Sequence, residues 1–366
     1  MCAAAANVRA RACTVGAGAH IRGLGEPSTG AAGWQSYTFR SRRGARDGEA
    51  AHAERVADVP TETRRELERR GASMKHVYRE TRRGALARLR PGVYAEGEAW
   101  RAAGLEERHL ALMRAAQNAA RSRLVFSHES AAILHGIPLI GAPPERPRIV
   151  VPPGSARSSS LVQRTCRSSG DFDVVALGDL LATDLVTTAV DVAASRSTLG
   201  GVVAMSHVRR HAGVPPERIR ERIDDRRPFR NARAAERALA ESTAGSDSPL
   251  ESLVMVRCAD LGFEAPEQQR PIVVGAGEYR LDFAWRDGRI VLEADGREKY
   301  EDERILDGRD PHDVLWQEKL REDAIRARVD AFARTTWAEA WAGAPLAETL
   351  ARLGVPRVRP ERPLTR

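Results

Sequence analysis

The stretch that most constrains the fold of this chain is residues 279–296, YRLDFAWRDGRIVLEADG. Asp287-Gly288 is a dipeptide typical of a two-residue type I′ turn, so we expect a β-hairpin here. Counting outward from that turn places Asp282 directly opposite Glu293. Side-chain alternation then predicts one core-facing side of the hairpin, formed by Leu281, Phe283, Trp285, Ile290, Leu292 and Ala294.

The other side of this hairpin is expected to be polar. It consists of Arg280, Asp282, Ala284, Val291, Glu293 and Asp295. Like charges on opposed strand positions destabilise a sheet, so three converging carboxylates need a compensating partner, and a bound divalent cation would provide one. Asp282, Glu293 and Asp295 are therefore candidate metal ligands, and ligation by oxygen alone favours Mg²⁺ or Mn²⁺ over zinc. An acidic face exposed to solvent remains the alternative.

The charge balance of the chain makes a nucleic-acid partner plausible. Its 366 residues, enough for two or three domains of about 100–150 residues, carry a formal net charge of +8. The four cysteines are scattered without CxxC pairs, which is typical of a reducing compartment. No apolar run approaches the ~20 residues of a membrane span, so we expect a cytoplasmic protein without a membrane partner.

Lysine is rare in this chain, and its placement is informative. Lys75, Lys299 and Lys319 are its only lysines, and the last two lie just downstream of the acidic hairpin. Arginine cannot replace a titratable amine, so these two lysines are candidates for a chemical role near the carboxylates.

The first hundred residues divide into two parts. We expect residues 1–57, rich in Ala, Gly, Arg and Ser, to be a disordered extension. Residues 58–100 have the order helix, turn, helix, β-hairpin, with the first helix starting at Thr61 and stopped by Gly71. This is the outline of a winged helix-turn-helix that binds double-stranded DNA. Its second helix, over residues 74–83, would turn Val77 inward and present a basic surface, whereas an ordinary helical hairpin with a solvated basic face is the alternative. The candidate DNA-binding residues are Lys75, Arg79, Arg82, Arg83, Arg88 and Arg90.

Residues 101–240 indicate a mixed α/β module. His207 and His211 have metal-competent helical spacing but no matching third ligand, so we interpret them as exposed helix residues. Ser127 and His128 are adjacent, yet no acid is expected beside them, and helix capping and packing explain them better.

Residues 240–248 are a candidate linker to a C-terminal domain over residues 248–345, with residues 346–366 as a tail. In the domain's first helix, Ser248 and Glu251 have the spacing of a capping box. For Glu251 this structural role and a functional one remain equally open.

The C-terminal domain resembles the very-short-patch-repair-like branch of the PD-(D/E)xK endonuclease fold. The resemblance is carried by ES at 251–252, Gln268 or Gln269, YRLDFAW at 279–285, LEADGREKY at 292–300, DVLWQEKLREDAIR at 313–326 and RTTW at 334–337. It implies Mg²⁺ or Mn²⁺ held by Asp282 and Glu293, with Glu251 as an added carboxylate. Asp295 stands where the family's triplet has lysine, so the resemblance implies an amine from elsewhere, with Lys299 preferred to Lys319.

Residues 60–200 resemble AbiEi-type antitoxins of type IV toxin–antitoxin systems. The matching segments are ELERRGASMKHVYRETRRGALARLRPGVYAEGE, FSHESAAILHGIPL and TDLVTTAVDVAA. This second resemblance implies a winged-helix DNA reader followed by an α/β module, and a nucleotidyltransferase-like toxin as a partner.

We therefore expect a multi-domain α/β protein with a winged helix, a mixed α/β module and a restriction-endonuclease-like domain. Two functions remain open: a metal-dependent DNA endonuclease in genome defence or repair, and a non-catalytic DNA-binding regulator of the antitoxin kind.

Overall fold

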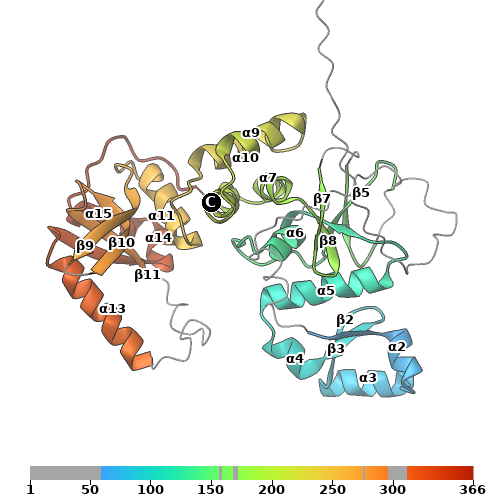
Figure 1. The fold of residues 1–366 in the computed structure, drawn as a ribbon. Coiled ribbons are helices and arrows are strands. Elements are labelled where there is room, and N and C mark those ends of the chain that lie inside the picture. Colours follow the sequence, from blue (N-terminus) through green and yellow to red (C-terminus); the bar gives the residue numbers. More distant parts are fainter. Residues whose placement is uncertain (1–58, 156–158, 168–171, 275–276, 296–310, 366) are drawn as a thin grey trace, which may run out of the picture. The chain divides into compact units, whose positions relative to one another are not determined.

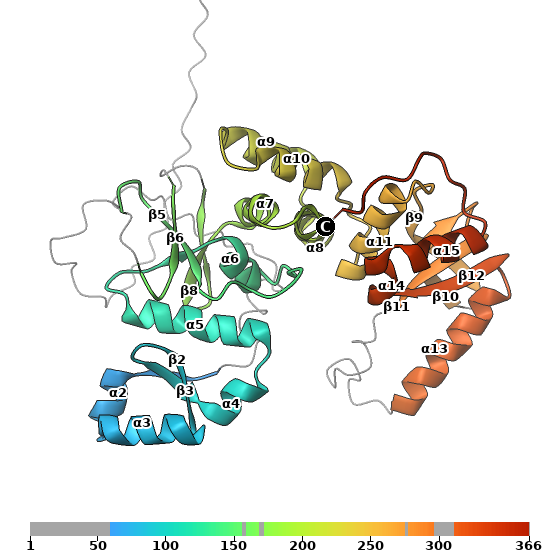
Figure 2. The same ribbon diagram turned by 180° about the vertical axis from the view of Figure 1, so that it is seen from behind.

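The described part of the chain is a mixed α/β protein, as the sequence predicts. The computed structural model describes residues 59–155, 159–167, 172–274, 277–295 and 311–365, with only the backbone for 311–318. Three sheets occur within these ranges (Figures 1 and 2). None of the helices in these ranges combines the length and apolar character needed to cross a membrane. The expected N-terminal extension and Lys299 fall outside the described residues.

The region after residue 58 forms a three-stranded antiparallel sheet, and two helices lie between its first and second strands in the chain. Its elements are β1 (Thr61–Thr63), α2 (Arg64–Arg69), α3 (Met74–Arg83), β2 (Leu86–Arg90), β3 (Val93–Glu96) and α4 (Gly97–Ala102). The strand order is β1-β3-β2. Helix α3 begins after Ser73, whose side chain accepts from the His76 N–H, and ends at Gly84 with φ of 75°. Val77 is buried, as predicted. Thr61–Thr63, which we expected within the first helix, instead pairs with β3.

A module with a five-stranded mixed sheet follows. Its strands are β4 (Val125–Phe126), β5 (Arg148–Val151), β6 (Gln163–Cys166), β7 (Val174–Leu177) and β8 (Leu180–Thr183), and its helices are α5 (Leu105–Ala119) and α6 (His128–His135). The strand order is β6-β5-β4-β8-β7. Leu110 and Met113 of α5 and Leu134 of α6 pack with Phe126 and Ile149, so the two helices cover one face of this sheet.

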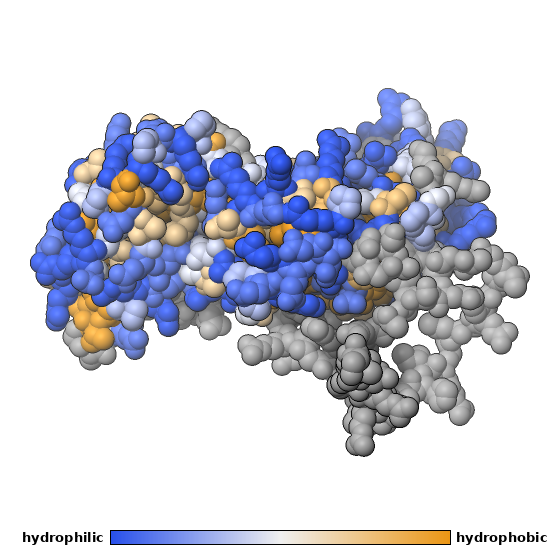
Figure 3. Space-filling view, turned by 90° about the horizontal axis from the view of Figure 1, so that it is seen from above, coloured by the Kyte–Doolittle hydropathy of each residue, from blue (hydrophilic) through white to orange (hydrophobic). Residues whose placement is uncertain are grey.

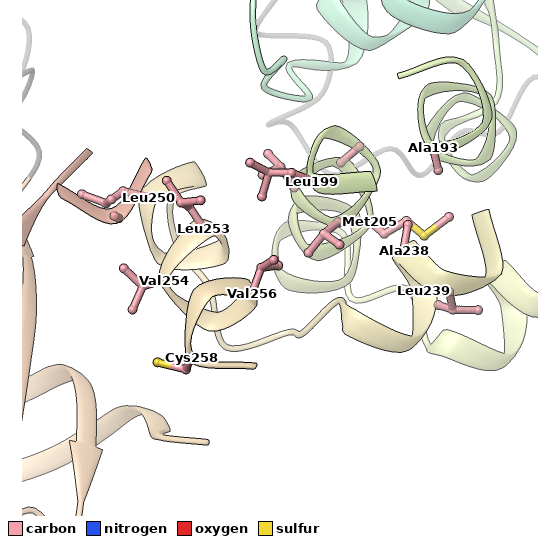
Figure 4. Packing of buried hydrophobic residues seen from close by; sticks show 14 of the residues in the cluster. Ala193, Leu199, Met205, Ala238, Leu239, Leu250, Leu253, Val254, Val256 and Cys258 are labelled. Carbon is pink, nitrogen blue, oxygen red and sulfur yellow. The ribbon is translucent and has the colours of Figure 1, made fainter. Parts of the chain in front are cut away.

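Helices then connect this module to the C-terminal domain. They are α7 (Leu185–Ser195), α8 (Thr198–His211), α9 (Pro216–Asp225), α10 (Ala232–Glu241) and α11 (Pro249–Asp260). Figure 4 shows Val256 of α11 pointing toward α8, whereas Val254 lies on the opposite side of α11; both belong to one buried cluster. The expected linker is hydrogen-bonded to the C-terminal sheet. Gln268, on a strand of that sheet, accepts from the Thr243 hydroxyl at 2.8 Å and donates to Ser246 Oγ at 2.9 Å.

The C-terminal sheet carries the predicted hairpin. Its elements are β9 (Glu267–Val274), β10 (Gly277–Trp285), β11 (Ile290–Asp295), α13 (Pro311–Arg326), β12 (Ala331–Thr336), α14 (Trp337–Ala342) and α15 (Ala344–Arg352). The strand order is β12-β11-β10-β9, and only β11 and β12 are parallel. Leu346 and Leu350 of α15 pack into the same core as α11, although we expected a tail from residue 346.

Both faces of this sheet are covered, which corrects the expectation of one polar face. Phe283, Trp285 and Leu292 pack in the cluster that contains α11, α14 and α15. Ala284 and Val291, expected on the polar face, are fully buried with Ile325 of α13. The correction arises because α13, far along the chain, covers the second face. On the face shown in Figure 3, hydrophilic residues predominate and hydrophobic residues form separate small patches.

Candidate functional site

The β10–β11 hairpin places Asp282 and Glu293 on neighbouring strands. The register pairs Phe283 with Leu292, and one further residue along the strands sets Asp282 opposite Glu293. The Ala294 N–H donates to Asp282 Oδ2 at 2.8 Å, which fixes that carboxylate beside β11. The expected register is present, but the loop is longer than the expected two residues: pairing ends at Trp285 and Ile290, and residues 286–289 form the turn. Arg286, Asp287 and Gly288 all adopt positive φ, and the Arg289 N–H donates to the Arg286 carbonyl.

Glu293 is a buried carboxylate whose hydrogen bonds are incomplete. It is 8% exposed, and its Oε1 has no hydrogen-bond partner among the described residues. Burial and, next, the negative charge of Asp282 raise the pKa of Glu293 to about 7, against the opposing charges of Arg321 and Arg334. An unpaired oxygen on a buried carboxylate is costly, so the site is poised for a cationic or proton-donating partner.

Glu251 supplies a third carboxylate from the first turn of α11. Its N–H donates to Ser248 Oγ at 3.2 Å, and its Oε1 accepts from the Ser248 hydroxyl at 2.9 Å. Its Oε2 accepts from the Asp247 N–H and from the Gln269 amide. Burial raises the pKa of Glu251; hydrogen bonds from Asp247 oppose the rise and the charge of Asp282 adds to it. Glu251 therefore caps the helix and also belongs to the electrostatic group of Asp282.

Gln269 reaches Glu251 from an unusual backbone conformation. Its φ is 52°, in the left-handed region that side-chain-bearing residues rarely adopt. Its Nε2 lies 3.0 Å from Glu251 Oε2. The backbone of β9 is therefore strained at Gln269, the residue that orients Glu251. Such strain is common at functional sites.

Two arginines that we did not single out from the sequence lie beside the carboxylates. Arg321 Nη2, on α13, is 3.3 Å from Glu293 Oε2. Arg334, on β12, pairs with Asp295 at 3.7 Å and with Glu322 at 2.9 Å. A single arginine is not a distinctive signal in a chain with 58 lysines and arginines, so only the folded contacts identify these two.

The remaining predicted residues of this site divide into three cases. Asp295 ends β11 and is paired with Arg334. Lys319 is exposed on α13. Lys299, the preferred amine, lies outside the described residues. Within the described ranges, no three His, Cys, Asp or Glu side chains form a group that could by itself hold a metal ion.

The basic residues predicted on α3, and on β2 beside it, are mostly exposed. Lys75, Arg82 and Arg88 are exposed and have no ion-pair partner among the described residues. Arg79 and Arg83 are also exposed, but both lie near Glu80, at 3.1 and 3.9 Å. Arg90 differs, because it is partly buried and donates to the backbone carbonyl of Glu145. The exposed members could reach phosphate groups, whereas Arg90 is engaged within the protein.

In the middle module, an acid does lie beside His128, contrary to our expectation. His128 Nδ1 is 2.9 Å from Ser127 Oγ and 3.7 Å from Asp191 Oδ2. Sequence could not reveal this contact because Asp191 comes from α7, far along the chain. Both neighbours approach the same ring nitrogen, so the three side chains do not form a proton relay through the imidazole. Asp191 is instead neutralised by Arg167 and Arg226.

The comparisons with known proteins leave the family open. No protein-family model matches the chain, and no curated protein matches its sequence. Among solved structures, the chain is similar to the crystal structure of the RV2827C protein from Mycobacterium tuberculosis, at 17% sequence identity and a TM-score of 0.33. That similarity covers 62% of this chain and 86% of the other. At this TM-score it supports no assignment of fold or function.

Proposed function

We propose that the C-terminal domain is a metal-dependent DNA endonuclease that hydrolyses phosphodiester bonds. The observation that carries the proposal is that Asp282 and Glu293 lie next to each other on β10 and β11, one residue beyond the last register pair, and that Glu293 has a buried oxygen without a partner among the described residues. Two neighbouring carboxylates repel each other when both are ionised, and a bound cation between them relieves this repulsion. The resemblance of this hairpin to PD-(D/E)xK endonucleases supports the same activity.

The carboxylates fit a hard divalent cation. Mg²⁺ and Mn²⁺ prefer oxygen ligands, and Mg²⁺ commonly uses one or two protein carboxylates with water and substrate oxygens completing its shell. Asp282 and Glu293 would hold such an ion, with Asp295 as a further candidate ligand. The ion would supply positive charge at the scissile phosphate and activate a water molecule for attack.

The other residues of the site would orient these groups. Glu251, held by Ser248 and Gln269, faces the charge of Asp282 and would position water or a second, weaker ion. Lys299 remains a candidate for contact with the phosphate on the strength of the resemblance alone. The region over α2, α3 and the β2–β3 hairpin would act as a winged helix and hold duplex DNA through the exposed cations of α3.

Plasmid nicking tests the endonuclease directly. Purified protein is incubated with supercoiled plasmid and Mg²⁺ or Mn²⁺, and wild type is compared with Asp282→Asn. A matched control is Asp287→Asn, which removes an exposed carboxylate from the turn of the same hairpin. We expect the control to nick like wild type and Asp282→Asn to be inactive. Equal nicking by Asp282→Asn and wild type would exclude the proposed site.

A DNA-binding regulator of the antitoxin kind is the second candidate. It is favoured by Asp295, which stands where an active triplet would have lysine, and by the exposed cations of α3. Under this alternative the chain binds DNA in a gel-shift assay but does not nick it with either metal. A nucleotidyltransferase-like toxin would then be the expected protein partner.

A further inference from the structure

We propose that Arg321 is the cationic group of this site, neutralising Glu293 before a divalent ion binds and contacting a non-bridging oxygen of the scissile phosphate afterwards. The inference rests on the proposed endonuclease function and assigns its positive charge to an arginine on α13.

The position of Arg321 is set by its helix and by two neighbours. Ile325, one turn further along α13, is 1% exposed and packs with Leu281 and Val291, which anchors the helix on the sheet. From there Arg321 Nη2 donates to the Arg280 carbonyl at 3.0 Å and to Glu293 Oε2 at 3.3 Å. The side chain of Arg321 therefore lies at the carboxylate pair without being part of a strand.

The ion pair between Arg321 and Glu293 is weak enough for Arg321 to leave Glu293 and bind a ligand instead. Charge-assisted N–H···O bonds in tight pairs measure about 2.7–2.9 Å and are often bidentate. Here one nitrogen reaches one oxygen at 3.3 Å, and the second oxygen of Glu293 has no partner among the described residues. The Arg321 side chain also remains 32% exposed, so it can move to a ligand in solvent.

Arginine is suited to the phosphate contact but not to proton transfer. Its guanidinium stays protonated at every working pH and forms paired hydrogen bonds with phosphate oxygens. Asp295, at the position of the family's lysine, carries a negative charge and pairs with Arg334. Arg321 forms an ion pair with Glu293, and its role is to stabilise the negative charge that develops on the phosphoryl oxygens.

Lys319 on the same helix does not duplicate this placement. Residues two apart on an α-helix point to different sides, and Lys319 is exposed while Arg321 reaches the sheet. Among the described side chains of α13, Arg321 is the one that contacts Glu293.

The test measures Mn²⁺ affinity and nicking rate separately, because the proposal moves them in opposite directions. Arg321→Gln removes a cation that competes for Glu293, so Mn²⁺ should bind severalfold more tightly, measured by electron paramagnetic resonance without DNA. At saturating Mn²⁺ the same variant should nick about 100-fold more slowly, the size of effect seen when one charge-stabilising donor is lost. Arg321→Lys should recover part of the rate, and it remains informative if the glutamine variant folds poorly.

Arg328→Gln is the matched control. It removes an exposed arginine just beyond α13 and should change neither Mn²⁺ affinity nor nicking. If Arg321→Gln instead loses Mn²⁺ binding, or nicks at the wild-type rate, this inference is overturned while the endonuclease remains. A wild-type protein that neither binds Mn²⁺ nor nicks overturns both proposals.

Discussion

His128 and Asp191 meet inside the middle module with a separation of 3.7 Å between Nδ1 and Oδ2. Burial lowers the pKa of His128 to about 4, against the opposing charge of Asp191. Because His128 is then neutral near pH 7, the charge of Asp191 is met by Arg167 and Arg226, at 2.6 and 2.8 Å. His128 contributes a hydrogen bond and packing near neutral pH. Its burial lowers the free energy of unfolding only in acid, where the unfolded chain protonates the imidazole and the folded chain does not.

We predict that this module loses stability as the pH falls from about 6.5 toward 4. Burial also lowers the pKa of His109 to about 4. In that range the unfolded chain binds protons at both histidines and the folded chain does not, so the free energy of unfolding falls with falling pH. A lowered pKa is worth about 1.4 kcal/mol per unit, so each histidine should cost roughly 2 kcal/mol on going from pH 7.5 to 5.

Urea unfolding at the two pH values measures this loss in the Glu293→Gln background, because the raised pKa of Glu293 makes the folded chain more stable as the pH falls and would offset the histidines. In that background His109→Gln should remove about half of the pH dependence. An unfolding free energy of the Glu293→Gln chain that is the same at both pH values would show that neither histidine is held neutral by burial.

A buried ion pair anchors the C-terminal segment, and breaking it should be costly. Arg257 and Asp260 are both fully buried, and Asp260 accepts from the Arg362 guanidinium and from the Thr365 N–H. Asp260→Ala leaves Arg257 without this carboxylate, so we expect a loss of about 3–5 kcal/mol. Thermal unfolding measures it, with Glu361→Ala, an exposed residue, as control. A loss no larger than that of the control would mean that the segment is held by its apolar contacts.

The parts of the fold that follow from local chemistry could be predicted from the sequence. Asp287-Gly288 determines the turn, the turn determines the register, and the register brings Asp282 to Glu293. Ser73 and Gly84 likewise set the ends of α3.

What could not be predicted depends on contacts between distant segments. Asp191 meets His128 only because α7 packs on α6, and Arg321 meets Glu293 only because α13 covers the sheet. Neither residue type is rare in this chain, so no local pattern distinguishes these two from their many equivalents. The same covering by α13 buries Ala284 and Val291, which alternation alone assigned to the polar side of the hairpin.

The exposed cations of α3 should control affinity for duplex DNA. Arg82→Ala/Arg83→Ala removes two candidate phosphate contacts, so binding should weaken and the slope of log affinity against log salt should decrease by about 2. Titrations by fluorescence anisotropy at several salt concentrations measure both. Arg218→Ala/Arg220→Ala, on exposed positions of α9, is a matched loss of charge. If both double variants reduce the slope equally, binding reflects net charge and not the surface of α3.

Glu251 caps α11 and also lies in the proposed active site, and two substitutions distinguish these roles. Ser248→Ala removes the cap, and should cost about 1 kcal/mol of stability with at most a small loss of nicking. Glu251→Gln keeps the side-chain length and the N–H donation to Ser248 but removes the charge facing Asp282, so nicking should fall at least tenfold, a typical loss for a group that positions reactants. Thermal unfolding and nicking rates, measured on both variants, decide the question. A purely structural residue affects the reaction only through the fraction of protein that is folded. If the loss of nicking in both variants is no larger than the loss of folded protein, Glu251 is a capping residue alone.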